Sequence, residues 1–144
     1  FLALMDSIAL AMPIGLGLVR IGNFLNGELF GRPTNGEWGF IFPTDPLGIP
    51  RHPSQLYECF LEGIILFFVL NYIARQNVAK GVTASALLIF YGLFRFIVEF
   101  FRQPDIHIGL MAFDLSMGQI LSLPMMIIGL VLVVVFQRNN ATIS

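Results

Sequence analysis

Cysteine and histidine are scarce in this chain of 144 residues, and their scarcity excludes several kinds of site. The single cysteine, Cys59, cannot form an internal disulfide or build a cysteine-based metal site. The two histidines, His52 and His107, are far apart in the sequence and lack the spacing of metal ligands. We therefore expect neither a disulfide scaffold nor a metal or other cofactor.

Charge is also scarce, because only 12% of the residues are charged while 56% are hydrophobic, and the mean hydropathy is +0.80. A water-soluble domain carries about 25% charged residues. The formal net charge of −1 and the lack of any run rich in lysine and arginine give no basis for nucleic-acid binding. The composition indicates a membrane protein whose main surroundings are the lipid bilayer.

Three apolar stretches are close to the roughly 20 residues that a helix needs to cross a bilayer. They are Leu56–Ala74, Val82–Phe101 and Met117–Phe136. A fourth, Leu2–Val19, is interrupted by an acid, a proline and glycines, which predicts a bent or shortened span. We expect an all-α, polytopic membrane protein with about four transmembrane helices and a long outer loop, forming a single membrane domain over residues 1–144.

The distribution of positive charge predicts the orientation of these spans. The connection Arg75–Lys80 carries two cations and no acid, and Arg138 follows the last span, so both are predicted to be cytoplasmic. Residues 20–55 and 103–116 then lie on the outer side, and with the adjoining helix ends they hold most of the charged side chains. We expect the polar chemistry at the outer face.

Arg95 lies within a predicted span, about six residues from its outer end, where a lone charge costs on the order of 3 kcal/mol. Glu99 and Arg102 follow at helical spacing, so the three side chains share one face. One explanation is a self-compensating ion pair near the membrane interface. The other is an anion site, because this face has more cations than acids and the planar guanidinium suits phosphate.

The segment Val19–Gly31 is the most informative part of the outer region. It places Arg20, Asn23, Asn26 and Glu28 among glycines. Glycine permits left-handed turns and asparagine caps backbone groups, so a helix end explains part of this composition. It does not explain Arg20 together with Glu28. Irregular backbone beside a bilayer requires surrounding protein or water, so we expect a polar loop that lines a cavity.

Four blocks in this order resemble the motifs of the prolipoprotein diacylglyceryl transferases: Arg20–Gly31, Arg51–Glu58, Tyr91–Asp105 and Ser116–Ser122. The sequence departs from the family pattern at Val19, where the family usually has glycine. The resemblance implies a seven-helix fold of which this chain supplies roughly the last four spans. The earlier spans and the His-Gly-Gly motif of the family are then expected upstream of Phe1, and the 144 residues alone are expected to be inactive.

The activity implied by the resemblance is transfer of the diacylglyceryl group from phosphatidylglycerol to the lipobox cysteine of a prolipoprotein. The thiol sulfur attacks the glyceryl carbon, a thioether forms and glycerol phosphate leaves, with no metal or nucleotide cofactor. The implied location is the bacterial cytoplasmic (inner) membrane, with the active site toward the periplasmic face. The partners are therefore a phospholipid and a signal peptide.

The site residues follow from the resemblance together with the chemistry of the donor. Arg20 and Arg95 are expected to clamp the phosphate and stabilise charge on the leaving group, with Glu99 orienting Arg95, and these three are the catalytic candidates. The substrate-binding candidates are Arg20, Asn23, Asn26, Glu28, Gly31 and Glu58. Among them, Glu28 is expected to orient Arg20, and Gly31 to serve backbone geometry.

Other polar residues receive simpler interpretations. Asn23 and Asn26 are expected to donate hydrogen bonds that shape the outer segment. Asp6 is either a functional acid inside an apolar stretch or a water-exposed group near the inner end of its helix. The spacing of Ser116 and Gln119 predicts a capping box without chemistry.

Two other classes of protein remain as alternatives. A transport subunit would also place polar groups within spans, but it is expected to show an internal repeat with a broken helix, and no repeat is found. A non-catalytic assembly module would not need surplus arginine beside a glycine-rich segment. Thioether-linked lipid on a lipobox peptide, as opposed to solute flux across vesicles, separates the enzyme from the transporter.

Overall fold

The computed structural model describes residues 1–35, 38–101 and 117–143, and within these ranges the chain is helical with no strand. The helices are α1 (Leu2–Leu25), α2 (Ser54–Glu58), the π-helix η1 (Cys59–Ile65), α3 (Leu66–Arg75), α4 (Val82–Val98) and α5 (Met117–Ile143). Two isolated bridges join Arg51 to Pro33 and to Phe40 in the loop between α1 and α2. The expected all-α class is confirmed.

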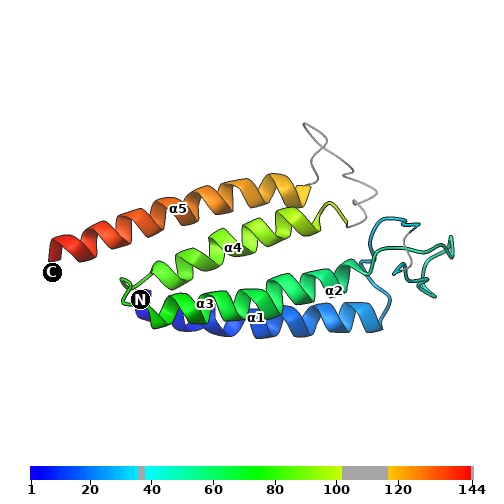
Figure 1. Cartoon of the computed structure of the whole chain (residues 1–144), viewed down its shortest axis with the longest axis horizontal. Coiled ribbons are helices and arrows are strands. Elements are labelled where there is room, and N and C mark those ends of the chain that lie inside the picture. Colours follow the sequence, from blue (N-terminus) through cyan, green and yellow to red (C-terminus); the bar gives the residue numbers. More distant parts are fainter. Residues whose placement is uncertain (36–37, 102–116, 144) are drawn as a thin grey trace.

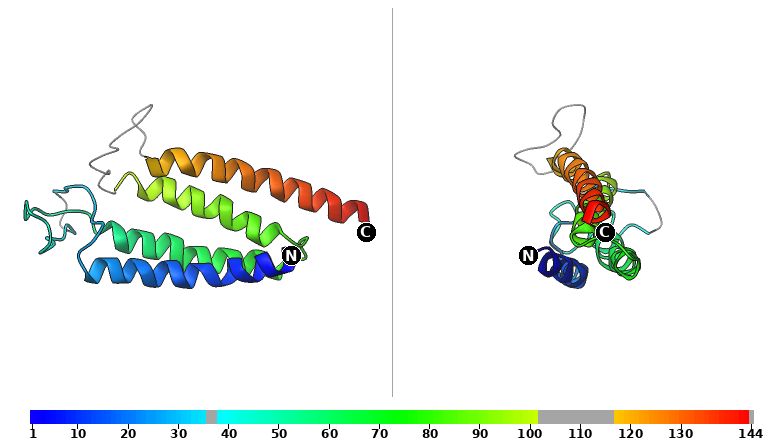
Figure 2. Two further views of the ribbon diagram at one scale, coloured as in Figure 1. Left: turned by 180° about the vertical axis from the view of Figure 1, so that it is seen from behind. Right: turned by 90° about the vertical axis from the view of Figure 1, so that its left-hand side faces the viewer.

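The helices lie side by side along one long axis, with α2, η1 and α3 forming one continuous rod (Figures 1 and 2). Three helical stretches are long and apolar enough to cross a membrane, namely Leu2–Leu25, Ser54–Arg75 and Gln119–Asn139. Helix α4, with 17 residues, is apolar but shorter. These helices confirm a polytopic membrane protein.

Different helix ends and connections lie at the two ends of the bundle. The end of α1, the start of α2, the end of α4 and the start of α5 meet at one end, together with the loop between α1 and α2 (Figure 1). The N-terminus and the connection from α3 to α4 lie at the other end. Helix α4 packs mainly against α5, while α1 packs mainly against η1.

Helix α1 is longer and more regular than the sequence suggested. The expected shortening of Leu2–Val19 does not occur, because Pro13 is accommodated inside a helix of 24 residues. Arg20 and Asn23 therefore project from a helix, and the prediction that they belong to an irregular loop is wrong.

The glycine that ends α1 is Gly27, which adopts a left-handed φ of 68°. Its N–H donates to the carbonyl of Phe24 at 3.1 Å, and the N–H of Glu28 donates to the carbonyl of Asn23 at 2.8 Å. This pair of bonds is a Schellman motif, which satisfies the last carbonyls of a helix and requires the left-handed residue at that position. Gly22, inside the helix, has no such role.

The ends of the other helices shift by a few residues from their predicted bounds. Helix α4 ends at Val98 instead of Phe101, which puts Arg95 in its last turn and Glu99 at its C-cap. Helix α5 begins at Met117 as predicted and continues to Ile143. Arg95 is therefore closer to the end of its helix than the sequence indicated.

Glycines allow close helix contacts at two places in the bundle. A Cβ added to Gly63 of η1 would lie 2.9 Å from the Cα of Gly17 in α1. A Cβ added to Gly129 of α5 would lie 2.8 Å from the carbonyl oxygen of Ser85 in α4. Small residues at such contacts let helix backbones approach closely, as is common between helices in membranes.

Asp6 caps the beginning of α4 from a different helix. Its two carboxylate oxygens accept hydrogen bonds from the N–H groups of Gly81 at 2.8 Å and Ala84 at 2.9 Å. The first N–H groups of a helix lack intrahelical partners, and negative charge is favourable beside them. Asp6 therefore joins α1 to α4, a role that neither interpretation from the sequence included.

Candidate functional site

Five charged side chains from α1, the α2–η1 rod and α4 meet near the loop end of the bundle. Arg20 Nε lies 2.5 Å from Glu58 Oε2. Arg95 Nη1 lies 3.5 Å from Glu58 Oε1 and 3.8 Å from Glu62 Oε1, while Arg95 Nε lies 3.1 Å from Glu99 Oε1. We call Arg20, Glu58, Glu62, Arg95 and Glu99 the charged cluster.

The helices fix the positions of these side chains. Arg20 lies in the last two turns of α1, and Arg95 lies in the last turn of α4 with Glu99 directly after it. Glu58 is the last residue of α2 and contacts both arginines, so it joins α1 to α4. The structure therefore brings together Arg20, Arg95, Glu99 and Glu58, which the sequence had selected separately.

Burial divides the cluster into two layers. The side chains of Glu58, Glu62 and Glu99 are at most 5% exposed, whereas those of Arg20 and Arg95 are 13% and 17% exposed. In a low dielectric, removing one partner of a buried pair leaves an uncompensated charge at high cost. The carboxylates are thus the most deeply buried groups of the cluster, and its accessible surface belongs to the two arginine side chains.

The charge balance differs from the sequence expectation. The described cluster has three carboxylates and two guanidinium groups, because Glu58 and Glu62 join from the neighbouring rod. The expected excess of positive charge is therefore not found within it. Arg102, which entered that expectation, lies outside the described residues.

Glu62 is the member of the cluster that sequence reasoning missed. It lies in the middle of an apolar span, where an ionisable residue suggests a functional site by default. It also follows Glu58 by four residues, a spacing that places two side chains on neighbouring positions of a helix. Both signals were present in the sequence.

Glu28 does not orient Arg20 in this structure. Its side chain is exposed, and its carboxylate forms no ion pair with any described residue, while Arg20 contacts Glu58. The backbone of Glu28 instead accepts a hydrogen bond from Gln55 Nε2 at 2.6 Å. Ser54 Oγ likewise donates to the carbonyl of Leu29 at 3.2 Å, so the start of α2 holds this turn of the loop.

Asn23 and Asn26 shape the end of α1 through their backbones rather than their side chains. The carbonyl of Asn23 accepts from the N–H of Glu28, and the N–H of Asn26 donates to the carbonyl of Gly22 at 3.0 Å. No hydrogen bond from either side-chain amide to another described residue is found, and the expectation that these amides bind substrate stays a prediction.

Gly31 has a steric reason to be glycine. Its N–H donates to the carbonyl of His52 at 2.9 Å, and an added Cβ would lie 2.5 Å from the carbonyl oxygens of both His52 and Phe101. No side chain fits at that distance. Gly31 therefore brings the loop, the start of α2 and the end of α4 together, which supports a role in backbone geometry.

A second buried ion pair lies in the outer loop. Arg51 Nε is 2.6 Å from Asp45 Oδ2, Arg51 Nη2 is 3.3 Å from Asp45 Oδ1, and the guanidinium carbon lies 4.7 Å from the centre of the Phe30 ring. The hydrogen bond from Arg51 lowers the pKa of Asp45 below its ordinary value, with backbone N–H donors such as that of Leu47 adding to the effect. We call Asp45 and Arg51 the loop pair.

Gln119 connects α5 to α4 close to the cluster. Its side chain is buried, and Nε2 donates to the carbonyl of Phe96 at 3.1 Å. The predicted capping box would use the side-chain oxygen of Gln119, so this hydrogen bond does not test it. Ser116, the other half of the predicted box, lies outside the described residues.

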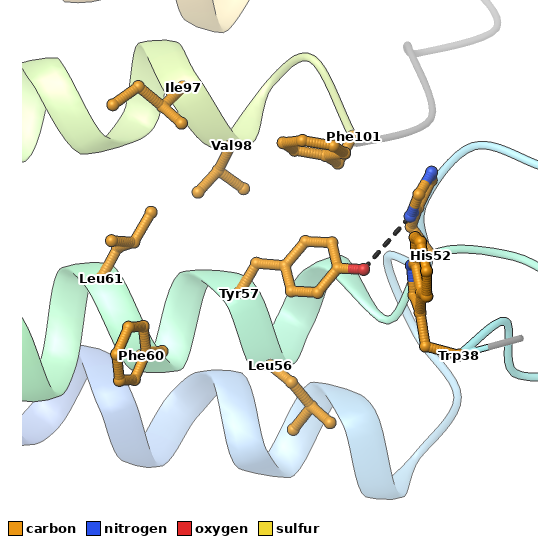
Figure 3. A pocket seen from close by; sticks show the side chains of 9 residues that line it. All are labelled: Trp38, His52, Leu56, Tyr57, Phe60, Leu61, Ile97, Val98 and Phe101. Atoms are coloured by element: carbon orange, nitrogen blue, oxygen red, sulfur yellow. Dashed lines mark hydrogen bonds between the residues drawn. The ribbon is translucent and has the colours of Figure 1, made fainter. Parts of the chain in front are cut away.

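An apolar cleft near the start of the α2–η1 rod is lined by no member of the charged cluster. It has a volume of about 430 Å³ and is lined mainly by apolar side chains of the α2–η1 rod, α4 and the loop (Figure 3). The hydroxyl of Tyr57 and Nδ1 of His52 are 3.1 Å apart at its polar end (Figure 3).

A smaller groove of about 230 Å³ is better placed relative to the arginines. Leu16 and Tyr91 line it, and each lies one helical turn before an arginine of the cluster. Its lining residues are Met12, Leu16, Leu87, Leu88, Tyr91 and Met125. An apolar groove thus lies between α1, α4 and α5, and residues one helical turn before each arginine line it.

Comparison with known proteins identifies the family. The family model described as prolipoprotein diacylglyceryl transferase matches residues 1–135. The chain belongs to this family. The residues that carried the resemblance include four members of the charged cluster, with Glu62 as the addition from the structure.

Named relatives agree with this assignment. The chain is 54% identical over 140 residues to the phosphatidylglycerol–prolipoprotein diacylglyceryl transferase of Geobacter sulfurreducens. The aligned region covers 97% of this chain and 54% of the relative. For the protein of the same name from Rickettsia akari, the identity is 54% over 132 residues, and the aligned region covers 90% of this chain and 51% of the relative. For the protein of the same name from Mannheimia succiniciproducens, the identity is 49% over 145 residues, and the aligned region covers 100% of this chain and 54% of the relative. The chain spans about half the length of the curated relatives it matches.

Proposed function

We propose that the charged cluster binds the phosphate of phosphatidylglycerol, and that the protein transfers the diacylglyceryl group of this lipid to the lipobox cysteine of prolipoproteins. The observation that carries the proposal is the layering of the cluster, in which buried carboxylates support two arginines that form its accessible face. The names of the relatives support the donor and the acceptor.

The chemistry of the donor fits this layering. Guanidinium groups bind phosphate oxygens through paired, charge-assisted hydrogen bonds. Glu58 and Glu99 contact the Nε edges of Arg20 and Arg95, which fixes both side chains before a ligand arrives. Preorganised donors of this kind stabilise negative charge as it develops and need no rearrangement during the reaction.

The transfer itself requires a thiolate and an anionic leaving group. The lipobox thiol gives up its proton to a base, its sulfur forms a bond to the glyceryl carbon, and the bond from that carbon to the phosphate oxygen breaks. Glycerol phosphate leaves with the electron pair of the broken bond. Arg20 and Arg95 stabilise this leaving group, and their positive charge also favours the thiolate over the thiol.

The acyl chains of the donor need an apolar surface next to the phosphate site. The groove that begins at Leu16 and Tyr91 offers such a surface one helical turn below the two arginines. We assign one acyl chain of phosphatidylglycerol to this groove. A lipid in this position reaches the cluster directly from the bilayer.

We also propose that the protein resides in the bacterial inner membrane, as one membrane domain, with the cluster toward the periplasm. Arg75 and Lys80 lie in the connection from α3 to α4, at the end of the bundle opposite the cluster (Figure 1). Positively charged connections favour the cytoplasmic side, so the cluster faces outward.

A chimera tests this function in the context of a complete relative. The present chain replaces the matching 140 residues of the Geobacter sulfurreducens protein, in vesicles that contain phosphatidylglycerol and a lipobox peptide. We expect thioether-linked diacylglyceryl peptide and glycerol phosphate in equal amounts. A correctly inserted chimera that forms neither, beside an active parent relative, would contradict the proposal, and solute flux without lipidation would favour a transporter.

A further inference from the structure

We infer that Glu62, carried by the rod of α2 and η1, is a positioning residue for Arg95. This inference rests on the proposed function only in its consequence for turnover. The contact between Glu62 and Arg95, and the dependence of Arg95 on it, stand on the geometry of the bundle alone.

Burial assigns Glu62 a supporting role. Its side chain is 0% exposed, so it does not reach a substrate. Glu62 Oε1 lies 3.8 Å from Arg95 Nη1. Glu99 Oε1 lies 3.1 Å from Arg95 Nε, on another edge of the guanidinium. The arginine is therefore held from its own helix and from the neighbouring rod. This arrangement restricts both the tilt and the rotation of the guanidinium plane.

Glu62 lies inside the π-helix η1 (Cys59–Ile65). The N–H of Leu66, at the end of η1, reaches back five residues to the carbonyl of Leu61. The extra residue in such a turn rotates the following part of the helix by roughly the 100° that one residue spans in an α-helix. In an uninterrupted α-helix, the residues from Leu66 onward would therefore face a different direction relative to Glu58 and Glu62. Single π-turns within α-helices are found frequently at functional sites.

The same segment also sets the position of α1. Gly63, next to Glu62, lies in backbone contact with Gly17, one turn before Arg20. This close approach holds α1 at the distance at which Arg20 meets Glu58. The α2–η1 rod thus contacts both arginines of the cluster, Arg20 through Glu58 and Arg95 through Glu58 and Glu62.

The expected effect of losing the Glu62 charge is on the transition state. Glu62→Gln keeps the size of the side chain but removes the ionic hold on Arg95. A contact that is needed chiefly in the transition state lowers kcat and kcat/KM together, so we expect kcat to fall at least about tenfold with KM changed less than about twofold. Glu62→Asp retains the charge and is expected to recover part of kcat.

The test combines a spectroscopic measurement on the 144-residue chain with kinetics on the chimera. In detergent micelles, the ¹⁵N resonance and hydrogen exchange of the Arg95 Nε–H report its environment directly. The control is Phe68→Leu, a conservative change at a side chain that is 65% exposed and outside the cluster. We expect Glu62→Gln to shift the resonance and speed its exchange, and Phe68→Leu to leave both as in the parent.

The possible results separate this inference from the proposed function. An unchanged Arg95 resonance in Glu62→Gln overturns the inference whatever the kinetics show. A shifted resonance with unchanged kcat in an active chimera overturns the consequence for turnover and therefore the positioning role. If the unmodified chimera is inactive, the proposed function fails, while a shifted resonance still supports the hold of Glu62 on Arg95.

Discussion

The charged cluster and the loop pair both bury arginine against carboxylate, but they use the arginine differently. In the loop pair, Arg51 is contacted by both oxygens of Asp45 and stacks over Phe30, and its side chain is 7% exposed. In the cluster, Arg20 and Arg95 are about twice as exposed, while their carboxylate partners are almost completely buried.

This difference separates a structural ion pair from a site that is ready for a ligand. The guanidinium of Arg51 is used within the protein, since Nη1 also approaches the carbonyl oxygen of Gly31 at 3.4 Å. The arginines of the cluster are fixed by carboxylates yet keep accessible surface next to an apolar groove. Accessibility, rather than the presence of an ion pair, therefore distinguishes the proposed phosphate site from the loop pair.

The largest expected effect is the loss of turnover in Arg95→Lys, made in the chimera. Lysine keeps the charge, but its ammonium group lacks the planar set of N–H donors with which a guanidinium binds phosphate and carboxylates at the same time. Removing one preorganised donor costs on the order of 10²-fold in rate, and we expect a loss of that size in initial rates of thioether formation. Turnover within about twofold of the unmodified chimera would remove Arg95 from the site.

A second prediction concerns the close contact that sets α1 against η1. Gly63→Ala places a Cβ 2.9 Å from the Cα of Gly17, whereas Gly17→Ala places one at an ordinary 3.5 Å from the Cα of Gly63. Overpacking of this kind costs about 1–3 kcal/mol, so we expect Gly63→Ala to lower the thermal unfolding midpoint and Gly17→Ala to lower it much less. Equal midpoints for the two variants would show that the helices separate freely here.

The loop pair is expected to give a dependence of stability on pH. The pKa of Asp45 is lowered in the folded protein, so its contribution is present above the ordinary pKa of about 4 and is lost as the pH falls through the lowered value. The thermal midpoint of the chain should therefore fall more steeply with acidification than that of Asp45→Asn. Parallel profiles for the two proteins would contradict a stabilising role for the pair.

The smallest expected effect lies at the opposite end of the bundle. Asp6 uses both carboxylate oxygens on the N–H groups of α4 and so resembles the loop pair rather than the cluster. Loss of a helix cap costs about 1 kcal/mol, and Asp6→Ala should lower stability by that amount with kcat/KM per folded molecule unchanged. A tenfold fall in kcat/KM would instead make Asp6 part of the site.

Much of the fold followed from the sequence, because apolar length and charge placement directly reflect the bilayer. The apolar helices were predicted from these patterns. The regular course of α1 was not, because several glycines were plausible helix ends and only the left-handed conformation of Gly27 distinguishes one of them.

The site was predicted in part. Arg95 and Glu99 share a helix, so their spacing alone predicted their contact. The partner of Arg20 was assigned to Glu28, which is near in sequence, whereas the structure supplies Glu58 from the next span. Contacts between helices depend on their packing and rotation, here including a π-turn, and hydrophobic periodicity does not determine either.

The most direct test of the comparison is to change Arg20 to Lys in the cluster and Arg51 to Lys in the loop pair, and to measure kcat/KM for phosphatidylglycerol in the chimera. With rates normalised to correctly folded protein, we predict a fall of at least about tenfold for Arg20→Lys, since the phosphate loses a planar donor. We predict a lower unfolding midpoint but a change below about twofold for Arg51→Lys. An equal or larger fall for Arg51→Lys would contradict the assignment of the cluster as the phosphate site.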